Sequence, residues 1–167
     1  MEIDFQEKAT QLLYREAYYL DCRRWSDWAM LYAEDCEFWV PAWRSDTEVT
    51  SNPEEEVSLI YIRSRQGLIE RAERVSSGRS VASFPPQRTA HTVGNILVDT
   101  DGSGPGKVMV RSVWNVHVYN PKRKLQDVFF TLCEHCLEAV GGDLLITRRK
   151  ALLQNDCLPT MLDFYSV

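Results

Sequence analysis

The sequence predicts an α+β fold, in which N-terminal helices pack on a strongly curved antiparallel sheet. Two observations predict this class. Apolar residues recur at helical spacing near the N-terminus, whereas long segments of alternating apolar and polar residues follow Pro86. Strands of roughly ten or more residues exceed the usual length and bend around the helices beside them. We therefore expect a cone or half-barrel with an interior pocket.

Apolar periodicity predicts the first elements. Residues 5–20 have the pattern of an amphipathic helix, with Glu16 at the edge of the apolar stripe. Residues 23–32 continue as a second helix whose inner face includes aromatic side chains. Segment 36–43 is aromatic and β-branched, which predicts a strand, and Pro41 places that strand near an edge or bulge.

The middle of the chain alternates between irregular and regular segments. Residues 44–56 are polar and turn-rich, which predicts an exposed loop. A short strand over 57–62 and a helix over 63–75 follow, and Gly67 weakens the helix pattern without ending it. Residues 76–87 form a second irregular segment.

Strands joined by turns are predicted for the rest of the chain, over residues 88–98, 107–119, 125–138 and 144–156. Segments rich in glycine and proline supply the turns, and Gly141-Gly142 is a strong signal for a short hairpin. The second of these strands alternates most cleanly. Its apolar face consists of Val108, Val110, Trp114, Val116 and Val118.

Length and composition indicate one domain over residues 1–167. The net charge of -5 argues against binding nucleic acid or an anionic membrane, since both need a clustered basic face. No apolar run approaches the roughly 18–20 residues that span a bilayer, and the N-terminus lacks a signal-peptide pattern. The five cysteines have no framework spacing, which indicates free thiols in a reducing cytoplasm.

Cys133, His135 and Cys136 raise the question of a metal or redox site. Side chains alternate along a strand, so Cys133 and His135 share a face while Cys136 points to the other. The Cys-x-His spacing matches the first half of a Rieske ligand pattern, but no later histidine completes it. We interpret the stretch as a strand without a metal.

The three histidines, His91, His117 and His135, lie on successive predicted strands. The turn over 120–124 places His117 and His135 several residues out of register. This offset argues against an iron site made of two histidines and one carboxylate. Each histidine is interpreted as a hydrogen-bonded structural residue.

An acid–base site is an alternative interpretation. A cone lined by Tyr32, Asp35, His91 and Tyr119 could hold a general base and a hydroxyl donor, as in isomerases and dehydratases. The simpler interpretation is that Asp35 belongs to a turn between a helix and a strand, where aspartate is common for backbone reasons. The sequence contains no glycine-rich phosphate loop, nucleophile elbow or His-Glu-x-x-His motif.

Because the sequence contains no convincing set of catalytic residues, we interpret the chain as a subunit of a larger assembly. Several aromatic residues are of types enriched at interface cores, although packing in the chain's own core explains each equally well. They are Trp39, Trp43, Phe84, Trp114 and Phe164.

The chain resembles the small (β) subunit of aromatic-ring-hydroxylating, Rieske-type dioxygenases. The similar stretches are "LLYREAYYLDCRRWSDWAMLYAEDCEFWVPAWRSD", "SLIYIRSRQGLIERAERVSSGRSVAS", "PPQRTAHTVGN" and the ending "LQND…LDFYSV". They cover nearly the whole chain in the right order. The segment with Trp39, Pro41 and Trp43 most resembles the benzoate and anthranilate branch, and the resemblance implies an interfacial or structural role for these three residues.

The resemblance implies a cone-shaped fold shared with nuclear transport factor 2, ketosteroid isomerase and scytalone dehydratase. It implies an α3β3 assembly with a β trimer, in which the large (α) subunit holds a Rieske [2Fe-2S] cluster and a mononuclear Fe(II). A reductase or ferredoxin component would deliver electrons from NADH, and O2 would dihydroxylate an aromatic carboxylate. For this cytoplasmic chain the resemblance implies no cofactor, no metal and no catalytic residue.

One family motif, Pro-x-Arg-Thr-x-His-x-x-x-Asn, maps onto Pro86, Arg88, Thr89, His91 and Asn95. The resemblance implies a structural or interfacial role for these residues. Gly94 stands where serine is frequent in the family. Arg88 offers a rigid fork of donors suited to a carboxylate across a subunit boundary, and His91 can hydrogen-bond beside it.

Two hypotheses from other functional classes stay open. One is a stand-alone isomerase or dehydratase of the cone fold that uses Tyr32, Asp35 and His91 on a small hydrophobic substrate. The other is a non-enzymatic protein that binds a small hydrophobic ligand.

Overall fold

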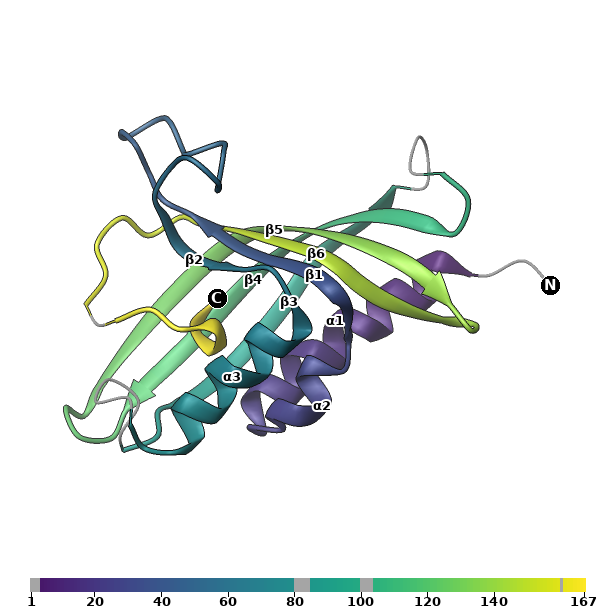
Figure 1. The fold of residues 1–167 in the computed structure, drawn as a ribbon. Coiled ribbons are helices and arrows are strands. Elements are labelled where there is room, and N and C mark those ends of the chain that lie inside the picture. The colour runs from purple at the N-terminus through teal and green to yellow at the C-terminus, as the bar shows by residue number, and fades with distance from the viewer. Residues whose placement is uncertain (1–3, 80–84, 100–103, 160) are drawn as a thin grey trace.

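The computed structural model describes residues 4–79, 85–99, 104–159 and 161–167. The elements are α1 (Phe5–Asp21), α2 (Trp25–Ala29), β1 (Tyr32–Pro41), β2 (Ser58–Ile62), α3 (Arg65–Ser76), β3 (Arg88–Asp99), β4 (Lys107–Asn120), β5 (Leu125–Val140), β6 (Asp143–Leu153) and the 3-10 helix η2 (Phe164–Ser166). Figure 1 shows the α-helices together on one side of a curved sheet, with η2 on the same side beside α3. The predicted α+β class is confirmed.

The sheet has the strand order β2-β1-β6-β5-β4-β3 in the part of the chain that the structure describes. Strands β3 to β6 form the predicted antiparallel meander. However, β1 pairs with β6 in the parallel direction. The expectation of an antiparallel sheet is therefore wrong at this one pair, and the sheet is mixed. This pairing places a strand from the N-terminal part next to the last strand of the chain.

Helix α1 begins at the predicted residue because the Asp4 side chain accepts a hydrogen bond from the backbone N–H of Glu7. Glu16 differs from the expectation: it lies fully buried in the helix face that meets the sheet, not at the edge of that face. The apolar residues buried on this face are Ala9, Leu12, Leu13, Ala17 and Leu20.

The second helix is shorter than predicted. Helix α2 ends at Ala29, and Tyr32, expected on its inner face, is the first residue of β1. The carbonyl oxygen of Leu31 accepts a hydrogen bond from the backbone N–H of Ile146 in β6. Pairing with a strand distant in sequence thus overrides the helical periodicity of this segment.

The two faces of the meander differ as the alternation predicts. The apolar residues predicted for one face of β4, from Val108 to Val118, are all buried. On β5 the opposite, convex face carries Val128, Phe130 and Leu132, which are 42%, 44% and 48% exposed. The sheet therefore covers the core with one face and leaves an apolar row on the other.

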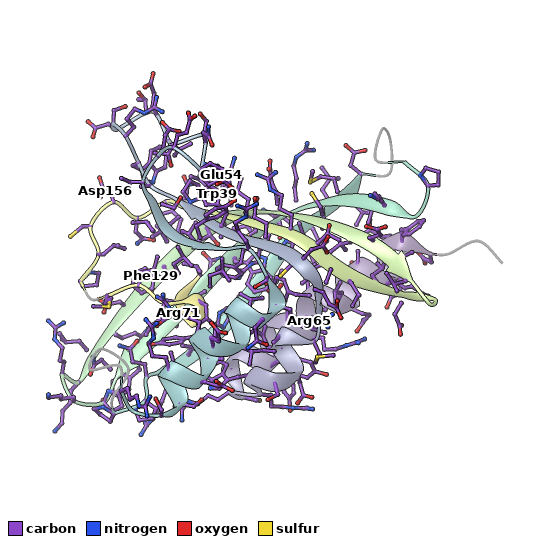
Figure 2. All side chains as sticks on the ribbon, viewed as in Figure 1. Trp39, Glu54, Arg65, Arg71, Phe129 and Asp156 are labelled. Atoms are coloured by element: carbon purple, nitrogen blue, oxygen red, sulfur yellow. The ribbon has the colours of Figure 1, made fainter. Side chains whose placement is uncertain are left out.

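The C-terminal segment occupies the interior of the curved sheet. Phe164 stacks on Trp28 with ring centroids 4.7 Å apart and meets Trp25 edge-on at 5.1 Å. Arg71 of α3, which is labelled in Figure 2, forms an ion pair with Asp163 at 2.9 Å. The region expected to form an interior pocket is thus packed with the chain's own side chains, Phe164 among them. Of the other aromatic residues considered for an interface, Trp114 is also in the core and Phe84 lies outside the described residues.

None of the helices that the structure describes combines the length and the apolar character needed to cross a bilayer.

Gly67 lies in α3 at a close approach to β2, where a Cβ atom would stand 2.7 Å from Cγ2 of Ile62. We predict that Gly67→Ala lowers the melting temperature, because this clash outweighs the gain of about 1 kcal/mol in helix propensity. In an Ile62→Ala background the clashing methyl is absent, so the same substitution should raise the melting temperature. Thermal unfolding followed by circular dichroism measures both changes, and a rise in the single variant would contradict the prediction.

Candidate functional site

Four polar side chains form a buried cluster between α1 and the concave face of the sheet: Glu16, Tyr32, His135 and Arg149. The Tyr32 hydroxyl donates a hydrogen bond to Glu16. The Glu16 carboxylate also lies 3.2 Å from Nε2 of His135 and 3.7 Å from Nη1 of Arg149. One carboxylate therefore joins α1 to β1, β5 and β6.

The buried cluster holds one ion pair and two neutral donors. Burial alone would raise the pKa of Glu16, but the charge of Arg149 and the hydrogen bonds from His135 and Tyr32 outweigh it and lower the pKa to about 2. Burial lowers the pKa of His135 and raises that of Tyr32. A carboxylate only accepts, so the neutral imidazole carries its proton on Nε2.

Arg149 extends the buried cluster to the C-terminal segment. Its Nη2 donates to the carbonyl oxygen of Val167 at 2.8 Å. Its guanidinium lies over the Trp114 ring, 4.5 Å from the centroid, where the ring face attracts the charge. The same group lies 3.9 Å from the Cys133 sulfur. Arg149 thereby anchors the segment that fills the interior.

A second polar group joins the end of α1 to β3 at the family motif. The Thr89 hydroxyl and the His91 backbone N–H donate to the Asp21 carboxylate at 2.8 and 2.9 Å. Nδ1 of His91 lies 2.5 Å from the same carboxylate. Burial alone would raise the pKa of Asp21, but the contacts with His91 and Thr89 lower it. Sequence reasoning missed Asp21, because a residue at the end of a helix carries no signal of its partner on a distant strand.

The other motif residues, Pro86, Arg88 and Asn95, are exposed. Arg88 is exposed, with its guanidinium 5.7 Å from the centroid of the Tyr119 ring. Pro86 is also exposed. Asn95 is exposed and has a φ of 51°, at an irregularity in the pairing of β3 with β4. The motif therefore splits into residues that hold α1 and residues that face solvent.

Trp39, Pro41 and Trp43 connect neighbouring segments of the sheet. Trp39 is 1% exposed, and its Nε1 donates to the Ser58 hydroxyl at 2.9 Å. Pro41 is buried, and Nε1 of Trp43 donates to the carbonyl oxygen of Leu153 at 2.7 Å. These contacts tie β2, and the loop before it, to β1 and β6.

The residues of the alternative acid–base site have separate surroundings. Tyr32 is buried and bonded to Glu16, Asp35 is exposed on β1, and His91 is bonded to Asp21. The contacts that the structure describes do not join the three into one group.

Cys133, His135 and Cys136 lie on β5, and the interpretation of this stretch as a strand is confirmed. Cys133 and His135 are buried on the concave side, while Cys136 is half-buried on the other. Burial raises the pKa of the Cys133 thiol, which disfavours the thiolate that metals bind. Among the residues described, no group of three or more His, Cys, Asp or Glu side chains could hold a metal ion.

The register of the meander bears out the predicted offset of the histidines. His117 pairs with Val128, and His135 pairs with Val110. The two imidazoles thus face different neighbours along the β4–β5 pair.

Comparison with known proteins identifies the family. The profile described as "Ring hydroxylating beta subunit" matches residues 15–160. The chain belongs to this family. It is 36% identical over 161 residues to the beta subunit of toluate 1,2-dioxygenase from Pseudomonas putida, covering 96% of this chain and 97% of that one. It is also 36% identical over 162 residues to the beta subunit of benzoate 1,2-dioxygenase from Acinetobacter baylyi, covering 96% and 93%.

Solved structures agree with this family and with the predicted cone fold. The beta subunit of benzoate 1,2-dioxygenase from Burkholderia mallei superposes with a TM-score of 0.79 at 29% identity, covering 100% of this chain and 99% of that one. A scytalone dehydratase-type protein from Novosphingobium aromaticivorans gives a TM-score of 0.67 at 16% identity, covering 95% and 91%, which shows the fold alone. The predicted resemblance to dioxygenase small subunits is confirmed.

Removing one partner of the Glu16–Arg149 pair leaves a buried charge uncompensated. We predict that Arg149→Met or Glu16→Gln each lowers the free energy of unfolding by about 3–5 kcal/mol. The double variant should lose less than the sum, because neither charge remains. Arg148→Met is the matched control: Arg148 is partly exposed beside Glu37, so its loss should be about 1 kcal/mol or less. Urea unfolding of the four variants and the parent measures the coupling, and additive losses would contradict it.

His135 gives the stability a pH dependence. Its pKa in the folded chain lies below the ordinary 6.5, so the unfolded chain binds the proton first as pH falls. The stability contributed by the neutral imidazole is therefore complete above pH 6.5 and is lost as pH falls through the folded pKa. Glu16 acts in a lower window, between 4.5 and about 2.

We predict that His135→Gln reduces the loss of stability between about pH 7.5 and about pH 5.5, because an amide keeps a donor for Glu16 but does not titrate. His117→Gln, on the exposed side of β4, should leave the loss unchanged. Urea midpoints at the two pH values test both variants. Equal pH dependence in the parent and in His135→Gln would refute the assignment.

Proposed function

We propose that the chain is the non-catalytic small subunit of a ring-hydroxylating dioxygenase that acts on an aromatic carboxylate. The supporting observation is the extent of the family relationship. The family profile matches residues 15–160, and the chain spans nearly the full length of small subunits of toluate and benzoate dioxygenases. The aromatic carboxylate is proposed because toluate and benzoate stand in the names of these relatives.

In this proposal the chemistry takes place on the large subunit. That subunit would hold the Rieske [2Fe-2S] cluster and the mononuclear Fe(II), and a reductase or ferredoxin would supply electrons from NADH. Both atoms of O2 would add to the ring and give a cis-dihydrodiol. The state of His135 and Cys133 supports placing the metal centres on the large subunit. Nε2 of His135 is hydrogen-bonded to Glu16, and burial raises the pKa of the Cys133 thiol and so keeps it protonated.

The chain would contribute to assembly, as part of an α3β3 complex with a β trimer. The solvent-facing motif residues are proposed to contact the large subunit. Stacking on Tyr119 orients the guanidinium of Arg88, whose planar donors suit a carboxylate of a partner. The five free cysteines support a reducing, cytoplasmic setting.

Co-expression with a candidate large subunit, sought in the gene next to that of this chain, tests this proposal. We predict a complex with equal numbers of the two chains and with iron, measured by size-exclusion chromatography, light scattering and metal analysis. The isolated chain should show no dioxygenase activity. Failure of the two chains to co-purify would contradict the proposal.

A charge reversal tests the contact surface within the same assay. Arg88→Glu should reduce the amount of large subunit that co-purifies, because the donor fork becomes an acid. Arg74→Glu, which reverses an exposed charge on α3, is the matched control and should not. Circular dichroism would verify that both variants are folded. Equal recovery of the complex with the Arg88→Glu and Arg74→Glu variants would show that Arg88 is not part of the proposed contact.

A stand-alone acid–base enzyme is the second candidate, and one observation favours it. Asp21 orients the His91 imidazole through Nδ1, as a carboxylate orients a general base. Nε2 of His91 is buried and has no hydrogen-bond partner among the described residues. Turnover of a small hydrophobic substrate by the isolated chain, abolished by His91→Gln, would favour this candidate over the subunit.

A further inference from the structure

A cavity of about 360 Å³ opens where the end of α1, the start of α2, the end of α3 and the start of β3 meet. Its size lies at the lower end of the range for small-molecule sites. Leu20, Trp25, Val75, Pro86 and Tyr165 provide an apolar wall with two aromatic rings. The described polar side chains in the lining include Arg23, Gln87 and Thr89. The cavity thus combines an apolar body with polar groups, as binding sites for small organic molecules do.

Arg23 supplies the positive charge in the described lining of this cavity. None of the described ion pairs involves Arg23, whereas its neighbour Arg24 pairs with Asp27 at 2.8 Å. Nη2 of Arg23 donates to the carbonyl oxygen of Gln87 at 2.8 Å, which holds the side chain at the cavity wall. The Asp21 carboxylate close by accepts from Thr89 and His91. A guanidinium has five N–H donors, so others remain for a ligand.

The backbone at Arg23 is a second, independent observation. Arg23 has a φ of 53°, a left-handed conformation that disfavours L side chains. The backbone N–H of Arg23 donates to the carbonyl oxygen of Leu20, and that of Arg24 donates to that of Tyr19. These two bonds form a Schellman motif, in which glycine is the usual residue at this position. An arginine here costs backbone free energy that a glycine would not, which indicates a use for the side chain.

We propose that the cavity binds a small aromatic acid, with its carboxylate on Arg23 and its ring against Leu20, Trp25 and Tyr165. A guanidinium matches the two oxygens of a carboxylate, and aromatic side chains favour contact with a flat ring. A purely apolar ligand would leave the Arg23 donors unused, and a neutral polar ligand would accept hydrogen bonds without compensating the positive charge. The choice of benzoate as probe rests on the substrate class of the proposed function. The site itself would be a binding site on the small subunit.

Titration of the full chain with sodium benzoate, followed by calorimetry, tests the proposal. We expect saturable binding of benzoate and at least about tenfold weaker binding of benzamide, which has the same ring without the charge. Arg23→Gln should lower the benzoate affinity to the level of benzamide. Arg24→Gln, the matched control, removes a neighbouring cation that pairs with Asp27 and should leave binding unchanged.

Arg23→Gly separates binding from a structural role. Glycine suits the left-handed backbone, so this variant should keep or raise the melting temperature while losing benzoate binding. A fall in melting temperature with unchanged binding would assign Arg23 to structure alone and overturn the proposal. Equal affinity of the parent chain for benzoate and benzamide, or no binding of either, would overturn it as well.

The outcome is independent of the assembly test. Recovery of the complex without benzoate binding by the free chain would refute this inference and leave the proposed function intact. Benzoate binding without a co-purifying large subunit would refute the proposed function and leave the inference standing.

Discussion

The fold depends on the buried ion pair between Glu16 and Arg149. A carboxylate without access to water needs a compensating charge and hydrogen bonds, and here every donor comes from a different strand. His135 and Arg149 lie directly opposite one another in the pairing of β5 with β6. A shift of one residue in that register would turn either side chain toward the convex face and leave Glu16 uncompensated. The pair therefore selects the register of the sheet as well as the position of α1.

The alternation of side chains along a strand also divides the roles of the motif residues on β3. Thr89 and His91 face α1 and hold its last residue, Asp21, while Arg88 faces solvent. On β5 the concave face carries His135 in the buried cluster, and the convex face carries an apolar row that includes Phe130. An exposed apolar row of this kind is common on surfaces that meet other proteins. The chain is thus built with one face committed to its own core and the other left open, as suits a subunit.

Local patterns predicted most of the fold. The long strands were predictable because one apolar face alternates with a polar one, and the same two-residue period separated Cys136 from Cys133 and His135. The features that the sequence did not predict depend on contacts between distant parts of the chain. Nothing near Glu16 in the sequence indicates a buried position, because its partners lie on strands far along the chain. The parallel pairing of β1 with β6, which also shortens α2, is equally invisible to local periodicity.

In the candidate site, too, single residues were predictable from the sequence and their distant partners were not. The motif on β3 was recognisable from its residues, but Asp21, to which Thr89 and His91 are bonded, was not. Tyr32 and His91 were both expected in one pocket, yet their partners, Glu16 and Asp21, lie on α1. Sequence reasoning identified chemically capable side chains. The contacts that decide their roles required the arrangement of helix and sheet.

The distance along the chain between Glu16 and His135, 119 positions, has a consequence for synthesis on the ribosome. Helix α1 leaves the exit tunnel long before β5 and β6 exist, so during most of translation its buried carboxylate lacks Arg149 and His135 and has only Tyr32 as a partner. One of the two strands that β1 pairs with, β6, is also the last of the described strands to be made. We expect the N-terminal half to stay open to proteases until β6 has emerged, which proteolysis of nascent chains stalled at successive lengths would reveal. Folding of the N-terminal half of this small subunit then depends on the synthesis of β6.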